Sequence, residues 1–105
     1  MEKLPLALTP FTHDLLEDIR KVQSILVGHG ARKIILYGSL ARGDYTDGSD
    51  IDICVEGLPA GNYFRALADC ITQIQRRVSI IDFDDTYGYF KARILREGKI
   101  LYEHE

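Results

Sequence analysis

The segment LYGSLARGDYTDGSDIDICV, residues 36–55, contains the features that decide the fold. Residues 33–37 (KIILY), which overlap the start of this segment, form a short run rich in β-branched side chains, which predicts a strand. Gly38-Ser39 ends this strand, and a short helix and a glycine-containing turn follow. Residues 49–55 (SDIDICV) then alternate polar and apolar side chains, a period typical of a second strand.

Outward from this segment, helical and strand patterns alternate along the chain. Apolar residues at helical spacing predict a first helix that starts at Thr9-Pro10 and ends at Gly28. The remaining elements are expected as a helix over 62–74, a strand over 77–83, a helix over 86–96 and a strand over 99–102. The predicted fold class is α/β (α+β), a small mixed β-sheet of about four strands packed against helices, in a single domain over residues 1–105.

Length and composition place the chain among ordinary globular domains. It has 105 residues, of which 46% are hydrophobic and 28% charged, with a net charge of −3. No apolar run approaches the roughly 18 residues of a membrane span, and we expect no secretory signal in residues 1–10. The acidic balance argues against nucleic acid as the main partner. Two cysteines without a CxxC motif indicate reduced thiols and a cytoplasmic protein.

The second predicted strand places two carboxylates on one face. Successive strand residues point to opposite sides, so Asp50, Asp52 and Cys54 share the face opposite the apolar residues. Two carboxylates on one strand face lie roughly 6.5–7 Å apart and repel each other unless a cation lies between them. Hard oxygen ligands select Mg²⁺ or Mn²⁺. The alternative is an acidic strand end exposed to water.

Gly38-Ser39 marks a second candidate binding feature. Glycine lets a ligand approach the backbone closely, and free N–H groups with a hydroxyl at a strand-to-helix turn form an anion site. A plain turn is the alternative. A phosphate-binding turn on one strand and a carboxylate pair on the next together suggest a metal-bound nucleoside triphosphate.

The whole pattern resembles the minimal nucleotidyltransferases of the DNA polymerase β-like superfamily. That family shows Gly-Ser, about ten residues and then Asp-x-Asp, which here are Gly38-Ser39, ten residues and Asp50-Ile51-Asp52. The Ala41-Arg42-Gly43 and Ser49-Asp50 runs also match, and the resemblance covers roughly residues 10–103. It implies a nucleotidyltransferase (polymerase β palm-like) fold.

The resemblance also implies a division of roles among these residues. Gly38 and Ser39 would hold the β- and γ-phosphates of ATP, the substrate, and Asp50 and Asp52 would bind Mg²⁺ (or Mn²⁺) and act in catalysis. Arg42 would lie near the triphosphate, with a solvated helix residue as the alternative. Ser49 is grouped with the nucleotide-binding residues because it completes the Ser-Asp match.

Active members of this superfamily carry a third acid on a later strand, and this chain departs from that pattern. The matching run is VSIID, residues 78–82, in which the first acid position is Ser79. In a regular strand Ser79 faces the side of Asp50 and Asp52, whereas Asp82 faces away unless a bulge or the strand end turns it. Asp82 is the third catalytic candidate and Asp84 its alternative. Three interpretations of the site follow. The protein is a working transferase that uses Asp82 or Asp84, a slow transferase, or a degenerate binding module.

The acceptor is expected on another polypeptide, because 105 residues leave no room for a domain that binds one. Minimal nucleotidyltransferases pair with HEPN-domain proteins as antitoxins and place AMP on a tyrosine of the toxin. The resemblance therefore implies a HEPN-domain partner. A toxin-neutralising binding module and a transferase for a small molecule or RNA end are the alternatives. Four arginines, Arg76, Arg77, Arg93 and Arg96, are expected on solvated faces, or as a basic patch for an acidic partner.

Overall fold

The computed structural model describes residues 11–104, and its centre is one four-stranded sheet with strand order β3-β2-β1-β4. β1 pairs antiparallel with both β2 and β4, whereas β2 and β3 are parallel, so the predicted mixed sheet of about four strands is confirmed. The strands are β1 (Lys33–Tyr37), β2 (Ile51–Glu56), β3 (Val78–Asp82) and β4 (Lys99–Glu103).

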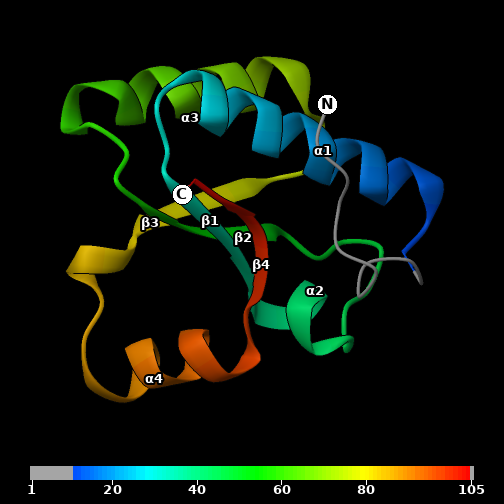
Figure 1. Ribbon diagram of the computed structural model, residues 1–105. Helices are drawn as coiled ribbons and strands as arrows, with labels where there is room; N and C mark the ends of the chain where they lie inside the picture. The colour runs from blue at the N-terminus through cyan, green and yellow to red at the C-terminus, as the bar shows by residue number, and fades with distance from the viewer. Residues whose placement is uncertain (1–10, 105) are drawn as a thin grey trace.

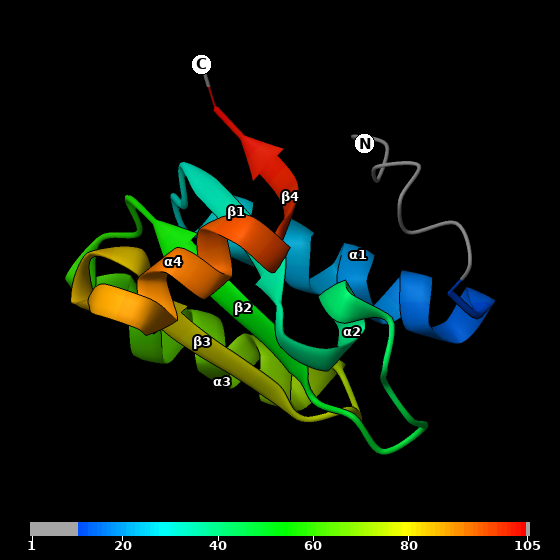
Figure 2. The same ribbon diagram turned by 90° about the horizontal axis from the view of Figure 1, so that it is seen from below.

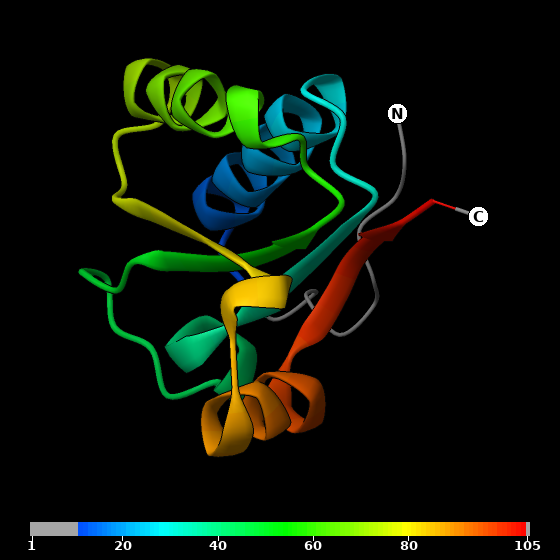
Figure 3. The same cartoon turned by 90° about the vertical axis from the view of Figure 1, so that its left-hand side faces the viewer.

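Helices lie on both sides of this sheet (Figure 1). The first side is covered by α1 (His13–Gly28) and α3 (Tyr63–Gln73), which pack side by side. The other side carries α4 (Gly88–Glu97), with the short α2 (Gly38–Arg42) beside it at the end of β1 (Figure 3). Two short 3-10 helices, η2 (Ala60–Asn62) and η3 (Phe83–Asp85), complete the fold.

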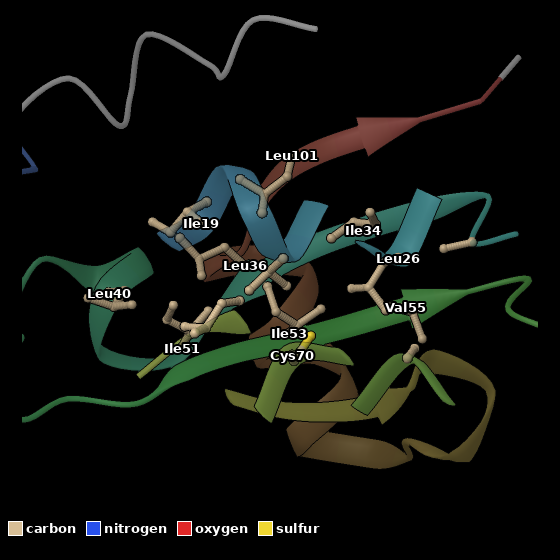
Figure 4. Packing of buried hydrophobic residues seen from close by; sticks show 14 of the residues in the cluster. Ile19, Leu26, Ile34, Leu36, Leu40, Ile51, Ile53, Val55, Cys70 and Leu101 are labelled. Atoms are coloured by element: carbon tan, nitrogen blue, oxygen red, sulfur yellow. The ribbon is translucent and has the colours of Figure 1, made fainter. Parts of the chain in front are cut away.

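The main core lies between the sheet and the α1–α3 layer (Figure 4). Ile51, Ile53 and Val55 of β2 are fully buried there, which confirms the predicted apolar face of this strand. Val78 and Ile80 of β3 pack against the same core, as their parity predicts. Each fully buried side chain of this size stabilises the fold by roughly 1.5–3 kcal/mol, so this layer fixes which face of β2 and β3 remains for chemistry.

The first helix begins later than predicted. Thr9-Pro10 lies outside the described residues, and α1 starts at His13 with Thr12 as its N-cap. The Thr12 hydroxyl accepts a hydrogen bond from the backbone N–H of Leu15 at 3.3 Å. Both threonines are suitable caps, and Phe11, the described residue before Thr12, is not helical.

Strand β2 and helix α4 also start two residues later than the sequence predicts. β2 begins at Ile51, so Asp50 lies in the loop that precedes the strand. α4 begins at Gly88 because Phe83–Asp85 form a 3-10 turn, capped by the Asp82 carboxylate, before the chain turns into the helix. The periodicity of side chains locates these elements but not the turns at their ends.

The second face of the sheet is less open than expected. Cys54 is fully buried in a small cluster with Ile35 of β1 and Ile94 of α4. The expectation that the whole acidic face of β2 meets water or a ligand is therefore wrong at Cys54, because α4 covers that end. The part that α4 leaves uncovered is the part that carries Asp52.

Among residues 11–104, no helix combines the length and the apolar character that crossing a membrane requires.

Candidate active site

Asp52 lies in the middle of the candidate site, on β2. Its register partners are Tyr37 on β1 and Ser79 on β3. Residues in register share a face of the sheet, so the three side chains lie together on the side of α4. Asp50 enters from the loop before β2. Partial burial and the charge of Asp50 raise the pKa of Asp52, and the Arg42 guanidinium opposes this by lowering it.

Gly38 places the end of β1 directly against Asp52. Its backbone φ is +74°, a left-handed conformation that favours glycine, and a Cβ at this position would overlap the Asp52 carboxylate. The Gly-Ser turn and the first carboxylate of β2 are therefore in contact, with Ser39 half-buried in the first turn of α2. Figure 2 shows the passage from β1 into α2 beside β2. The structure thus places Gly38 against Asp52, with Ser39 next in the chain.

Arg42 lies on the α4 side of this corner. Its guanidinium forms ion pairs with Asp44, Nε to Oδ2 at 3.3 Å, and with Glu97 of α4, Nη1 to Oε1 at 3.8 Å. A cavity of about 110 Å³ lined by Tyr37, Gly38 and Arg42 adjoins these contacts. Arg42 is therefore an exposed cation held by two carboxylates at the edge of the site, close enough to Asp52 to lower its pKa.

Ser49 is part of a closed turn in the loop before Asp50. Its hydroxyl accepts a hydrogen bond from the backbone N–H of Thr46 at 2.9 Å, and its own N–H donates to the Thr46 carbonyl at 3.0 Å. The side chain that the sequence grouped with the nucleotide-binding residues therefore shapes the loop that carries Asp50.

Ser79 occupies the position that the sequence predicts for it, next to Asp52 in the parallel register. Asp82 pairs instead with Val55, and its carboxylate accepts from the Asp84 backbone N–H at 3.0 Å. Asp82 also lines a cavity of about 480 Å³ together with Tyr63 and Phe90. Within residues 11–104 no group of three or more ligand side chains is arranged to hold a metal ion.

Tyr37 has a role that the sequence did not indicate. Its ring packs edge-to-face on Phe90 of α4 with centroids 5.9 Å apart, and its side chain lies close enough to Ser79 to influence the pKa of the phenol. Burial, followed by the charges of Asp52 and Cys54, raises the pKa of Tyr37 to about 12. The phenol therefore stays protonated at neutral pH.

Arg76 is the second residue whose role sequence reasoning missed. Its side chain is 22% exposed rather than solvated, and it donates to backbone carbonyls of the loop before Asp50. No local pattern distinguishes it from Arg77 beside it, because its partners lie 27 and 29 residues away.

The donor set of Asp50 and Asp52 suits a hard divalent cation. Two carboxylates close enough to shift one pKa repel each other, and a bound Mg²⁺ or Mn²⁺ would relieve that repulsion. Because Gly38 has no Cβ, its backbone lies directly against the Asp52 carboxylate. Phosphate oxygens held at this turn would therefore reach a cation bound by Asp52. The residues present therefore fit a metal-bound triphosphate.

The fold and this corner define the nucleotidyltransferase class, and comparison with known proteins agrees. The family model "Polymerase beta, Nucleotidyltransferase" matches residues 20–105. The chain belongs to this nucleotidyltransferase family, and the predicted resemblance and fold are confirmed.

One curated relative and two solved structures illustrate the similarity. "Putative protein adenylyltransferase MJ1547" of Methanocaldococcus jannaschii is 33% identical over 72 residues, which are 69% of this chain and 56% of that protein. The chain therefore matches little more than half the length of this relative. The structure of a toxin-antitoxin with AMP-PNP has a TM-score of 0.69 and 21% identity, over 82% of this chain and 73% of that one. The tri-AMPylated Shewanella oneidensis HEPN toxin in complex with MNT antitoxin gives a TM-score of 0.63 and 19% identity, over 86% and 72%.

Proposed function

We propose that this chain transfers AMP from Mg²⁺-bound ATP to a hydroxyl group of a partner protein. The observation that carries the proposal is the contact between Gly38 and Asp52, which joins the candidate phosphate turn to the candidate metal ligand. Membership of the nucleotidyltransferase family supports the reaction class. The AMP-PNP complex of a structural neighbour supports ATP as the donor.

The residues of the site divide the work. Asp50 and Asp52 would hold the Mg²⁺ (or Mn²⁺), which when bound would offset the charge of the triphosphate and of the leaving pyrophosphate. Gly38 and Ser39 would seat the β- and γ-phosphates, and Arg42 would add positive charge at the edge of the site. Ser49 would act by shaping the loop in front of Asp50.

The reaction forms one bond and breaks another. The acceptor oxygen attacks the α-phosphorus, the bond from that phosphorus to the bridging oxygen breaks, and pyrophosphate leaves. The hydroxyl proton needs an acceptor. Asp82 is our candidate from the end of β3: its register partner is Val55, on the face opposite Asp52, but it lines the 480 Å³ cavity that Phe90 of α4 also lines, where an acceptor side chain would meet its carboxylate. Asp84, two residues later in η3, is the alternative.

The proposed partner is a HEPN-domain protein in the cytoplasm. The structural neighbour that combines a HEPN toxin with an MNT antitoxin supports this partner, and the description of the curated relative as a protein adenylyltransferase supports a protein as the acceptor. Two buried cysteines that form no disulfide suit a reducing compartment. The net charge of −3 favours docking to a protein over capture of nucleic acid.

A second candidate function is neutralisation of the partner by binding alone. The observation that favours it is Ser79 in register with Asp52, where a third carboxylate would be expected. A site with two carboxylates would still bind metal and nucleotide, while the transfer step would lose the factor of about 10²–10⁴ that a general base supplies.

Mass spectrometry of a candidate HEPN-domain protein after incubation with Mg²⁺ and ATP tests the proposal. We expect a mass increase of one or more AMP groups with the wild type, none with Asp50→Asn, and the wild-type increase with Asp47→Asn as a loop control. Neutralisation of the partner by both the wild type and Asp50→Asn, with no mass change, would establish the binding module instead. Pyrophosphate release with RNA or a small hydroxyl compound, and none with the protein, would identify a different acceptor class.

A further inference from the structure

Arg76, in the connection between α3 and β3, joins three separate parts of the chain. Its Nη1 donates to the backbone carbonyls of Asp47 at 2.9 Å and Ser49 at 3.1 Å. Its Nε lies 3.9 Å from the Asp18 carboxylate of α1. The guanidinium of Arg76 thus connects three parts of the chain: the loop between α2 and β2, the start of β3 and helix α1. The loop and the start of β3 lie side by side in Figures 2 and 3.

The two carbonyls belong to the turn that delivers Asp50. Thr46 and Ser49 close this turn on itself through two hydrogen bonds, and Arg76 ties the closed turn to the rest of the fold. On the other side of Asp50, the Ile51 N–H donates to the Arg77 carbonyl at 2.9 Å. The chain is therefore anchored immediately before and immediately after Asp50, both times to the same two-residue segment.

This anchoring opposes two unfavourable effects. Asp50 stands near Asp52 and raises its pKa, so repulsion between the carboxylates favours a displaced loop. The loop also contains Gly43 and Gly48, whose conformational freedom is lost when it is ordered. Arg76 supplies a planar donor that fixes the backbone, which sets it apart from Arg77, although both line the groove that Asp50 also lines.

We propose that Arg76 is a positioning residue that holds Asp50 where it can bind a divalent cation together with Asp52. The metal part of this inference rests on the proposed function. The hold on the loop before Asp50 does not, and it can be measured without any metal. Arg77 offers a matched control, because it carries the same charge at the next position and its side chain is exposed.

The test compares Arg76→Gln, Arg76→Lys and Arg77→Gln with the wild type. Mn²⁺ affinity is measured by electron paramagnetic resonance with a non-hydrolysable ATP analogue, so no turnover is involved. We expect Arg76→Gln to weaken Mn²⁺ binding about tenfold, the low end of the effect of residues that orient metal ligands. Arg76→Lys keeps the positive charge and a single ammonium donor, so it should recover part of the lost Mn²⁺ affinity. Arg77→Gln should bind Mn²⁺ as the wild type does.

Hydrogen exchange of the amides in residues 44–51, in the absence of metal, gives the second readout. Arg76→Gln should speed exchange there and leave the core of β1 unchanged, whereas Arg77→Gln should do neither. Unchanged exchange in Arg76→Gln, or equal effects of both glutamine variants, would overturn the inference. If the wild type itself binds no Mn²⁺, the metal assignment fails while the exchange comparison still decides the hold on the loop. Should Arg76→Gln not fold, Arg76→Lys carries both measurements.

Discussion

Ser79 on β3 and Asp52 on β2 are direct register neighbours and share one face of the sheet. In the parallel pairing, a carboxylate at position 79 would lie beside the Asp52 carboxylate and reach the same ligand. The chain instead has a hydroxyl there, close to the side chain of Tyr37. This pair of positions therefore decides whether the site has two acids or three.

Ser79→Asp should increase the rate of AMP transfer. A third carboxylate at this position completes the metal site and can accept the acceptor proton, so we expect a gain on the order of 10²-fold, the low end for a general base. The measurement is the initial rate of AMP incorporation into the partner with Mg²⁺-ATP. Ser79→Asn is the matched control, with similar size and no charge, and should give no gain. A Ser79→Asp variant that binds Mg²⁺-ATP normally and transfers AMP no faster would show that position 79 is not the place of the third carboxylate.

Gly38→Ala should weaken binding of metal and nucleotide more than its effect on stability explains. Gly38 and Gly43 both have positive φ, +74° and +91°, so alanine at either costs roughly 1–2 kcal/mol of backbone strain. A Cβ at Gly38 would also displace the Asp52 carboxylate, whereas Gly43 has open space around it. Urea unfolding and Mg²⁺-ATP titration of both variants separate the two effects. Equal loss of binding in both variants would mean that contact with Asp52 is unimportant.

The sequence specified the faces of the strands better than it specified the contacts between distant segments. The parity of Ile53 and Ser79 was predictable because a strand has a period of two and one face must be apolar. The cover over Cys54 was not, because it depends on where Ile94 of α4 packs. The contacts of Arg76 were also not predictable, since they go to carbonyls 27 and 29 residues away and have no side-chain signature. Local chemistry therefore located the acids, and tertiary packing determined what surrounds them.

Both cysteines should be inert to thiol reagents in the folded protein. Cys54 and Cys70 are fully buried, and burial, with smaller contributions from nearby carboxylates, raises their pKa values to about 12 and about 11. At pH 8 neither the access nor the thiolate that the reaction needs is available. Titration with Ellman's reagent should show slow reaction without denaturant and two rapid equivalents in urea. Fast labelling of one thiol in the native state would show that α4 does not cover Cys54.

Asp52→Asn should stabilise the metal-free protein near neutral pH. Burial and the Asp50 charge raise the pKa of Asp52 above its ordinary value of 3.8, so the folded state holds this proton more tightly than the unfolded state does. The contribution of Asp52 to the free energy of unfolding therefore falls as the pH rises from the pKa of the unfolded state through the pKa of the folded state. Above both pKa values the ionised carboxylate destabilises the fold. Urea unfolding in EDTA, followed from pH 3 to pH 8, should show the advantage of Asp52→Asn appear above pH 4 and level off once the pH has passed the raised pKa of the folded state. Mg²⁺ with ATP should reverse the order by stabilising the wild type and not Asp52→Asn. An Asp52→Asn variant that is less stable than the wild type at pH 7 without metal would mean that Asp52 serves the fold rather than a ligand.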